Sequence, residues 1–367
     1  MHQFPSVIAS LGDRVSTPAP IVLIDVVEEN INRMQAFAQT HGKQLRPHVK
    51  THKSLEIGRL QLSAGACGLT AGTLSEAEIF AGAGCDSILL AYPVWPAGSK
   101  GERLQRLVQR TDLSVGIESR EAVDALADAM GTLRSRLGVV VEVDCGARRS
   151  GVRPDAAGAL AAYARSRGLH ARGVFTYPGH GGTVGAREDA ARDQAAALRE
   201  AVDALTENGI EAEVVSAGST PTAEFSIDPV ISEIRPGEYV FNDYDNFRLG
   251  DCATQDVGLF LASTVVSDQG HEHVILDAGT KALAREGNPD RGYGQVPSYG
   301  GYLAKLNEYH GFLRLPPGGA RPRVGERIAV VPHHVCPVVN SFDELLVTDS
   351  AGSLLDRWRV DAQGQLS

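Results

Sequence analysis

The chain has 367 residues, of which 43% are hydrophobic and 22% charged, an ordinary composition for a globular protein. Its formal net charge of -10 argues against nucleic acid or an anionic membrane surface as a partner. Five cysteines form no disulfide framework, the N-terminus lacks the pattern of a signal peptide, and no apolar run reaches roughly 18 residues. We therefore expect a soluble, cytoplasmic protein.

Short β-rich runs alternate with helical stretches from about residue 20 to 245. Several runs are continuously apolar, as strands buried on both faces are. The expected strands are 21–26, 45–48, 68–72, 87–92, 113–117, 139–144, 173–177 and 214–219. Amphipathic helices are expected between them, for example over 28–40, 74–83 and 186–208. The alternation favours an α/β fold with a (β/α)8 TIM-like barrel, although an open doubly wound sheet would produce the same pattern.

The pattern of elements changes after about residue 250. Strands are expected at 258–266, 273–277, 327–331 and 344–347, separated by Gly/Pro-rich turns rather than by long helices. The first 15–20 residues could add a strand to this region. We expect a cofactor-binding barrel over residues 18–250 and a mainly β domain made of residues 1–17 and 251–367.

The segment 45–53, LRPHVKTHK, ends the second expected barrel strand. Barrel enzymes place their chemistry on the face where the C-terminal ends of the strands meet. Pro47 and the preceding strand argue against a charged surface helix. A lysine here can project into the barrel mouth, where its neutral amine would form an imine with an aldehyde. A solvated surface lysine is the alternative, and the pattern alone leaves both open.

Two glycine-flanked loops follow later strands. In 146–152, GARRSGV, an arginine can hydrogen-bond a phenolate, a pyridine nitrogen or a carboxylate through its fixed fork of donors. In 175–182, FTYPGHGG, glycines let a ligand approach the backbone, and Tyr177 can stack on an aromatic ligand. Ordinary structural turns would also account for each loop.

The segment 216–222, SAGSTPT, follows the eighth expected strand. Small residues with exposed N–H groups after strands 7 and 8 form the usual phosphate site of a barrel. A further glycine-containing segment, 235–239 with sequence RPGEY, comes shortly after it.

His334 and Cys336 lie in the segment 332–337, PHHVCP. On an extended chain, residues i and i+2 point to the same side, as a shared metal requires. Two ligands make an incomplete site that water or substrate completes, which suits a catalytic metal. A coincidental pair is the alternative.

Together these segments resemble the D-serine dehydratase and D-threonine aldolase family of fold-type III pyridoxal-phosphate enzymes, which have an alanine racemase-like barrel. The resemblance covers about residues 17–356. It implies that Lys50, and not Lys53, binds pyridoxal 5'-phosphate as a Schiff base, and that Arg149 lies beside the cofactor. The other cofactor contacts that it implies are Tyr177, Gly218, Ser219, Thr220, Gly237 and Tyr239. Relatives often have histidine where this chain has Pro178, which leaves the role of His180 open.

The resemblance also implies that His334 and Cys336 bind a divalent metal. Members similar to D-serine dehydratase have a His-X-Cys pair, whereas a D-threonine aldolase type has His-X-Asp. A thiolate suits zinc, and a carboxylate suits manganese or magnesium. We therefore favour zinc, with manganese and magnesium as alternatives.

The activity implied by the resemblance is that of a lyase for D-β-hydroxy-α-amino acids. The His-X-Cys pair favours a D-serine dehydratase-like reaction, which converts D-serine or D-threonine into a keto acid and ammonia. The alternative is D-threonine aldolase, which gives glycine and acetaldehyde. An amino-acid racemase has no use for the metal pair, and a non-catalytic cofactor carrier has no β domain. A homodimer is implied by the family.

Overall fold

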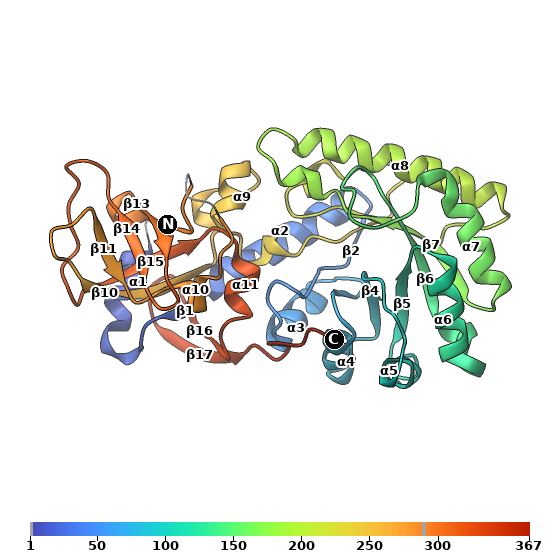
Figure 1. The fold of residues 1–367 in the computed structure, drawn as a ribbon, viewed down its shortest axis with the longest axis horizontal. Coiled ribbons are helices and arrows are strands. Elements are labelled where there is room, and N and C mark those ends of the chain that lie inside the picture. The colour runs from blue at the N-terminus through green and yellow to red at the C-terminus, as the bar shows by residue number, and fades with distance from the viewer. Residues whose placement is uncertain (1–2, 288–290) are drawn as a thin grey trace. The chain divides into compact units, whose positions relative to one another are not determined.

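The computed structural model describes residues 3–287 and 291–367 and is shown in Figure 1. Two compact units are present, and each is described by itself. The β-rich unit is the described part of Met1–Asn32, Thr51–Glu56 and Glu238–Gly364, and the barrel unit is Arg33–Lys50, Ile57–Gly237 and Gln365–Ser367. Among the described residues, no helix has the length and apolarity needed to cross a bilayer.

The barrel unit contains eight parallel strands in the hydrogen-bonded order β2-β9-β8-β7-β6-β5-β4-β3. A parallel bridge between His48 and Thr70 joins the segment after β2 to β3, the two ends of that order, and so closes the ring. The predicted TIM-like barrel is confirmed. The strands are β2 (Gln44–Leu45), β3 (Leu69–Ala71), β4 (Ser87–Leu90), β5 (Asp112–Ile117), β6 (Gly138–Val143), β7 (His170–Thr176), β8 (Val214–Ala217) and β9 (Glu233–Ile234).

Helices alternate with these strands (Figure 1), as the periodicity predicted. Gly158 lets two of them approach closely, because a Cβ at this position would lie 2.0 Å from the carbonyl oxygen of Ala204. The helices are α2 (Ile24–Thr40), α3 (Leu55–Ser63), α4 (Leu74–Gly82), α5 (Ser99–Leu107), α6 (Arg120–Met130), α7 (Ala157–Ser166) and α8 (Arg187–Glu207). The helices predicted at 28–40, 74–83 and 186–208 are thus confirmed as α2, α4 and α8.

The prediction of a first barrel strand over residues 21–26 is wrong. The strand found there, β1 (Ala19–Leu23), pairs with β10 (Leu259–Ser267) and β16 (Glu344–Thr348) in the β-rich unit. All five residues of β1 are buried, so its apolar pattern does not differ from that of a barrel strand. The missing barrel strand is β9, whose two residues are too few for any periodicity. Lys50 therefore follows the first barrel strand rather than the second, and 216–222 follows the seventh rather than the eighth.

The β-rich unit is built on a nine-stranded sheet with the order β11-β14-β13-β12-β15-β10-β1-β16-β17. Its other strands are β11 (His273–Leu276), β12 (Gly294–Val296), β13 (Gly301–Leu306), β14 (Gly311–Arg314), β15 (Arg327–Pro332) and β17 (Leu354–Arg359). The four predicted strands correspond to β10, β11, β15 and β16, and the mainly β character of this region is confirmed. The short strands β12, β13 and β14 and the exposed edge strand β17 were not predicted.

The first described residues form a helix, α1 (Phe4–Leu11), instead of a strand. Its Phe4 ring stacks on Phe260 of β10, with 4.5 Å between the ring centroids. Three short helices complete the unit: α9 (Tyr244–Leu249), α10 (Thr280–Leu283) and α11 (Val335–Val339). By contacts, residues 18–32, 51–56 and 238–250 group with the β-rich unit, whereas our sequence-based limits put them in the barrel, and residues 365–367 group with the barrel unit instead of the predicted β domain. Residues 1–2 and 288–290 of the predicted β domain lie outside the described residues.

An ion pair between a partly buried arginine and a buried glutamate lies in the barrel unit. Arg46 Nε donates to Glu233 Oε2 at 2.6 Å, with side-chain exposures of 13% and 4%. Ser216 Oγ donates to Glu233 Oε1 at 2.5 Å. Arg46 also donates to Ser87 Oγ at 2.9 Å. Because β2 and β4 are not neighbours in the sheet, the contact between Arg46 and Ser87 crosses the inside of the barrel. It links Ser87 of β4 to the ion pair.

Candidate functional site

The candidate cofactor residues of the barrel unit follow the C-terminal ends of different strands. Lys50 follows β2, Arg149 follows β6, Tyr177 follows β7, the segment 218–220 follows β8, and Gly237 follows β9. Because the strands are parallel, all these positions lie on one face of the barrel. Only Tyr239, which is buried in the 3-10 helix η6 (Glu238–Val240), belongs to the β-rich unit.

Lys50, Arg149 and Tyr177 are brought together. Lys50 Nζ lies 5.7 Å from the centroid of the Tyr177 ring, and the guanidinium carbon of Arg149 lies 4.9 Å from the same centroid. Cations at these distances are attracted by the quadrupole of an aromatic ring. The three side chains thus form one cluster around the tyrosine, as the resemblance implied.

Arg149 is carried by a loop whose shape depends on glycine. Asp144 Oδ1 accepts hydrogen bonds from the backbone N–H groups of Gly146 (2.9 Å) and Arg148 (3.0 Å). Gly151 has φ +101°, and a Cβ there would lie 2.7 Å from the backbone nitrogen of Asp144. The chain can therefore turn back at residue 151 only with glycine, and this turn holds the loop that presents Arg149.

Glu142, to which sequence analysis gave no role, supports this loop. It lies on β6, its Oε1 accepts from Ser150 Oγ at 2.7 Å, and the same oxygen lies 3.9 Å from Arg149. Burial raises the pKa of Glu142, while Ser150 and Arg149 lower it. The buried carboxyl group thus anchors both residues, although the Arg149 side chain itself is 63% exposed.

The segment after β8 forms a tight, buried turn. Gly218 has φ +81°, and its N–H donates to Gln194 Oε1 of α8 at 3.0 Å. The N–H of Ser219 donates to Thr222 Oγ1 at 3.0 Å. Ser219 and Thr220 are 8% and 6% exposed. Gln194 was not singled out from the sequence, because only the folded chain brings α8 against this turn.

These residues fit the cofactor that the resemblance implies. Lys50 offers an amine for the aldehyde, Arg149 and Tyr177 offer groups for an aromatic ring, and the turn after the seventh strand lies where barrels bind phosphate. His180, whose role was open, lies beside the loop that carries Arg149: its Nε2 pairs with Asp193 at 3.2 Å, and a Cβ on Gly146 would lie 3.3 Å from its ring.

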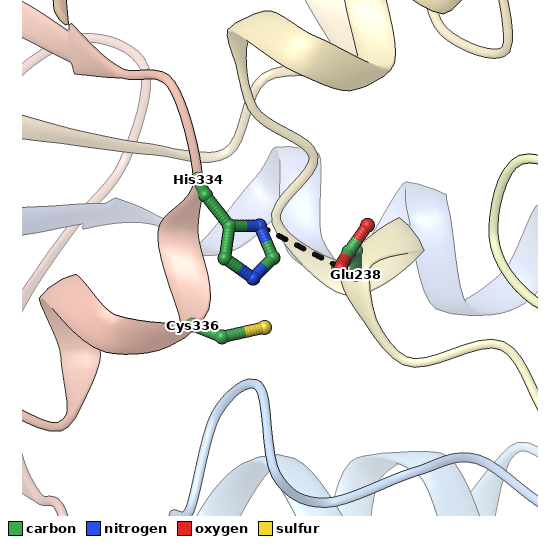
Figure 2. Close-up of side chains that lie close together, drawn as sticks. All are labelled: Glu238, His334 and Cys336. Carbon is green, nitrogen blue, oxygen red and sulfur yellow. Dashed lines mark ion pairs between the residues drawn. The ribbon is translucent and has the colours of Figure 1, made fainter. Parts of the chain in front are cut away.

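A second cluster lies in the β-rich unit, where Figure 2 shows Glu238, His334 and Cys336 side by side. Each offers one ligand atom, and these atoms all lie within 4.8 Å of one another. The structure thus brings together the predicted pair, but the reason we gave was wrong. His334 is the N-cap of α11 and Cys336 lies in its first turn, so the chain is not extended there. Glu238 was missed.

Asp243 orients His334. Asp243 Oδ2 lies 3.3 Å from His334 Nδ1 and accepts the N–H of Val335 at 2.9 Å. With a proton on Nδ1 shared with this carboxylate, Nε2 keeps its lone pair for a metal. Burial lowers the pKa of His334, but Cys336, Asp243 and Glu238 raise it to about 12. Such anionic surroundings favour a cation in the cluster.

His333 is not part of this cluster. Its Nδ1 lies 3.4 Å from Asp245, and its Nε2 lies 2.9 Å from the carbonyl oxygen of Arg291. Both ring nitrogens therefore face partners other than the ligand atoms. His333 is therefore a neighbour of the cluster and not one of its candidate ligands.

The replacement Asp243→Asn is expected to weaken divalent-metal binding by about 10–100-fold, the usual cost of losing a carboxylate that orients a ligating histidine. Competition with a chromophoric chelator measures the dissociation constant. Asp245→Asn is the matched control, because Asp245 contacts His333 instead of a ligand. An unchanged affinity in Asp243→Asn would show that this carboxylate does not orient His334.

Comparison with known proteins identifies the family. Residues 22–245 match the family described as alanine racemase, N-terminal domain, and residues 258–348 match the putative serine dehydratase domain. The chain belongs to the alanine racemase-like family. It is 34% identical over 360 residues to a D-threonine aldolase of Arthrobacter sp, covering 96% of this chain and 93% of that protein. It is also 34% identical over 366 residues to the D-threo-3-hydroxyaspartate dehydratase of a Delftia species, covering 93% and 96%.

Solved structures of the alanine racemase-like family agree with this. The crystal structure of D-threonine aldolase from Filomicrobium marinum has a TM-score of 0.88 and 30% identity, covering 96% of this chain and 97% of that one. A structure of a cysteine-to-alanine variant of D-threo-3-hydroxyaspartate dehydratase, described as metal-free, has a TM-score of 0.86 and 33% identity, covering 94% of this chain and 97% of that one. The resemblance is thus confirmed, and the chain is an enzyme of the pyridoxal-phosphate-dependent lyases in this family.

Proposed function

We propose that the protein is a pyridoxal-phosphate- and divalent-metal-dependent lyase of D-β-hydroxy-α-amino acids, of the D-serine dehydratase type. The observation that carries the proposal is the presence of two clusters with complementary chemistry. Lys50, Arg149 and Tyr177 form a cofactor cluster on the barrel face. The β-rich unit adds the ligand cluster around His334 and Cys336, for which a racemase has no use.

Each group has a chemical task in this proposal. Bound pyridoxal phosphate supplies an electron sink, and a bound divalent metal supplies a Lewis acid for the β-hydroxyl group. Lys50 Nζ holds the cofactor in the resting enzyme and, once the substrate amine has taken its place, can accept the proton from the α-carbon. Arg149 and Tyr177 keep the aromatic ring in place, and His334 and Cys336 hold the metal.

D-threonine aldolase is the second candidate, because relatives named aldolase and dehydratase are equally similar to this chain, at 34% identity each. The two reactions differ in which bond breaks. Removal of the α-proton by Lys50 with loss of the hydroxyl group leads to a keto acid and ammonia. Removal of the hydroxyl proton instead breaks the Cα–Cβ bond and leaves glycine and an aldehyde. Cys336 supports the dehydratase.

A product assay tests the proposal. The purified protein, supplied with pyridoxal phosphate and either zinc or manganese, would be given D-serine, D-threonine and D-threo-3-hydroxyaspartate separately. We expect a keto acid and ammonia in equal amounts, and no turnover of L-serine or L-threonine. Glycine and acetaldehyde from D-threonine, with no keto acid, would establish the aldolase instead. If the protein bound the cofactor but converted none of these substrates, the proposal would fail, and the amino-acid racemase and the non-catalytic cofactor carrier would be the remaining hypotheses.

We also propose zinc as the metal, a cytoplasmic location and a homodimer. An imidazole and a thiolate are ligands that zinc prefers over manganese or magnesium. No disulfide links any two of the five cysteines, in keeping with a reducing compartment. The homodimer is supported by the resemblance to the family. Metal analysis of protein purified without added metal tests the assignment of zinc. Light scattering coupled to gel filtration tests the homodimer.

A further inference from the structure

We propose that Thr51 is a positioning residue for the metal: its hydroxyl group holds the sulfur of Cys336 and donates a hydrogen bond to it when the thiolate binds the ion. This inference rests on the proposed function, since it requires that Cys336 binds a metal. It gives a role to a residue of the RPHVKTHK segment, directly after Lys50, to which sequence analysis gave none.

A hydrogen bond joins the two residues. Cys336 Sγ lies 3.2 Å from Thr51 Oγ1. Thr51 is fully buried, and Cys336 is half-buried. A buried hydroxyl group requires a hydrogen-bond partner, and the sulfur supplies one.

The chemistry of the pair allows this bond with and without a metal. A thiol can donate its proton to the hydroxyl oxygen, whereas a metal-bound thiolate has no proton and can only accept. A threonine hydroxyl group serves in both cases, because it has one proton and two lone pairs. Thr51 can therefore reverse the direction of the hydrogen bond when Cys336 binds the ion.

Both partners are held within the β-rich unit. The N–H of Ala362 donates to the carbonyl oxygen of Lys53 at 3.0 Å and so ties the segment after Thr51 to the end of the unit. Cys336 lies in α11, of which the three other valine positions are fully buried: Val335, Val338 and Val339. Because both backbones are packed in this way, the hydrogen bond sets the direction in which the Cys336 side chain points.

That direction is the one a metal needs. The candidate ligand atoms of Glu238, His334 and Cys336 lie within 4.8 Å of one another, and Figure 2 shows the sulfur beside the imidazole. A cysteine side chain has three staggered positions, and holding it in one of them before the metal arrives reduces the entropy lost on binding. Thr51 thus does for the thiolate what Asp243 does for the imidazole.

The hydrogen bond also changes the metal that the thiolate binds. A donor beside a cysteine sulfur draws electron density from it, and hydrogen bonds of this kind tune metal–thiolate centres. A thiolate that gives less charge to the ion leaves it a stronger Lewis acid for the β-hydroxyl group of the substrate. Loss of the Thr51 hydroxyl group should therefore be visible in the electronic spectrum of the metal.

The test compares variants with and without the hydroxyl group in the cofactor-loaded enzyme. In Thr51→Val, we expect zinc affinity to fall by about 10-fold, the lower end of the usual effect of losing an outer partner of a ligand. Thr51→Ser keeps the hydroxyl group and should bind zinc like the parent. A chromophoric chelator measures the dissociation constants. Thr348→Val is the matched control, because Thr348 is an equally buried threonine of the same unit whose hydroxyl group donates to the carbonyl oxygen of Val22.

The cobalt-substituted enzyme gives a readout that a purely structural role would not change. A hydrogen bond lowers the energy of the sulfur electrons, so its loss should move the sulfur-to-cobalt charge-transfer band to longer wavelength. The band is read as the difference between cobalt-loaded and metal-free enzyme, which removes the absorbance of the cofactor. We expect the shift in Thr51→Val, and parental bands in Thr51→Ser and Thr348→Val.

The outcomes separate this inference from the proposed function. Parental zinc affinity and a parental band in Thr51→Val would overturn the inference, as would equal changes in Thr51→Val and Thr51→Ser. Weaker zinc binding without a shift of the band would assign Thr51 to packing alone and overturn it as well. A parent protein that binds no metal would overturn both the inference and the metal dependence of the proposed function. The expected shift in a parent that converts no D-amino acid would overturn the function alone.

Melting of the metal-free forms checks that the variants fold. Should Thr51→Val not fold, Thr51→Ala carries the test, with the same expected loss of affinity and the same shift of the band. Parental affinity and a parental band in that variant would overturn the inference.

Discussion

The replacement Lys50→Arg is expected to abolish turnover and covalent retention of the cofactor. Arginine keeps a long, positively charged side chain, but it stays protonated and does not form an imine with an aldehyde. Loss of a general acid–base group alone costs about 10²–10⁴-fold in rate, and loss of the covalently held cofactor adds to this. The visible absorbance of the protein after gel filtration and the rate of product formation measure the two effects.

Lys53→Arg is the matched control, because it changes the other lysine of the RPHVKTHK segment in the same way. Lys53 Nζ donates to the carbonyl oxygen of Ala362 at 3.3 Å, within the β-rich unit, and is not part of the cluster around Tyr177. We expect this variant to keep its cofactor absorbance. If Lys53→Arg lost the absorbance and Lys50→Arg kept it, the assignment of the cofactor lysine would be wrong.

The replacement Glu233→Ala is expected to destabilise the protein by about 3–5 kcal/mol, the usual cost of breaking a buried ion pair by removing one partner. The variant leaves the Arg46 side chain, which is only 13% exposed, without its carboxylate and deprives the Ser216 hydroxyl of its acceptor. Chemical denaturation, followed by far-ultraviolet circular dichroism, gives the free energy of unfolding.

A surface pair provides the comparison for this prediction. Arg153 and Asp155 form an ion pair in the barrel unit with side-chain exposures of 83% and 49%. Asp155→Ala should cost less than about 1 kcal/mol, since solvent screens such pairs. Equal losses in the two variants would mean that burial of the Arg46–Glu233 pair does not set its contribution.

The barrel could be predicted because buried parallel strands have a simple signature, a short apolar run followed by an amphipathic helix. The same signature misled us at β1, because a strand in the middle of a nine-stranded sheet is buried on both faces as well. No local sequence pattern distinguishes a strand of the barrel from an interior strand of the nine-stranded sheet. The strand β9 escaped prediction because its two residues acquire strand geometry only from their neighbours β2 and β8.

The site shows the same division between local and distant information. Lys50, Arg149 and Tyr177 could be proposed from the sequence because each follows a strand of the barrel, whose C-terminal face collects them. Glu238 and Asp243 could not be placed with His334, because Asp243 alone is 91 residues away along the chain and acidic loop residues are usually solvated. The only local signal was that Glu238 lies between Gly237 and Tyr239, two residues that the resemblance assigned to the cofactor.

The N-terminal end of α11 and the 3-10 helix η6 bring three residues that could bind a metal together from distant parts of the chain, so an ion held by all of them would act as a crosslink in the β-rich unit. Anything that binds only the folded state raises its stability, by about 4 kcal/mol when its free concentration is 1,000 times the dissociation constant. The melting temperature should then rise with metal concentration and fall with chelator. In a cell short of the metal, the protein would lose abundance through unfolding and proteolysis as well as activity, which couples its level to metal supply.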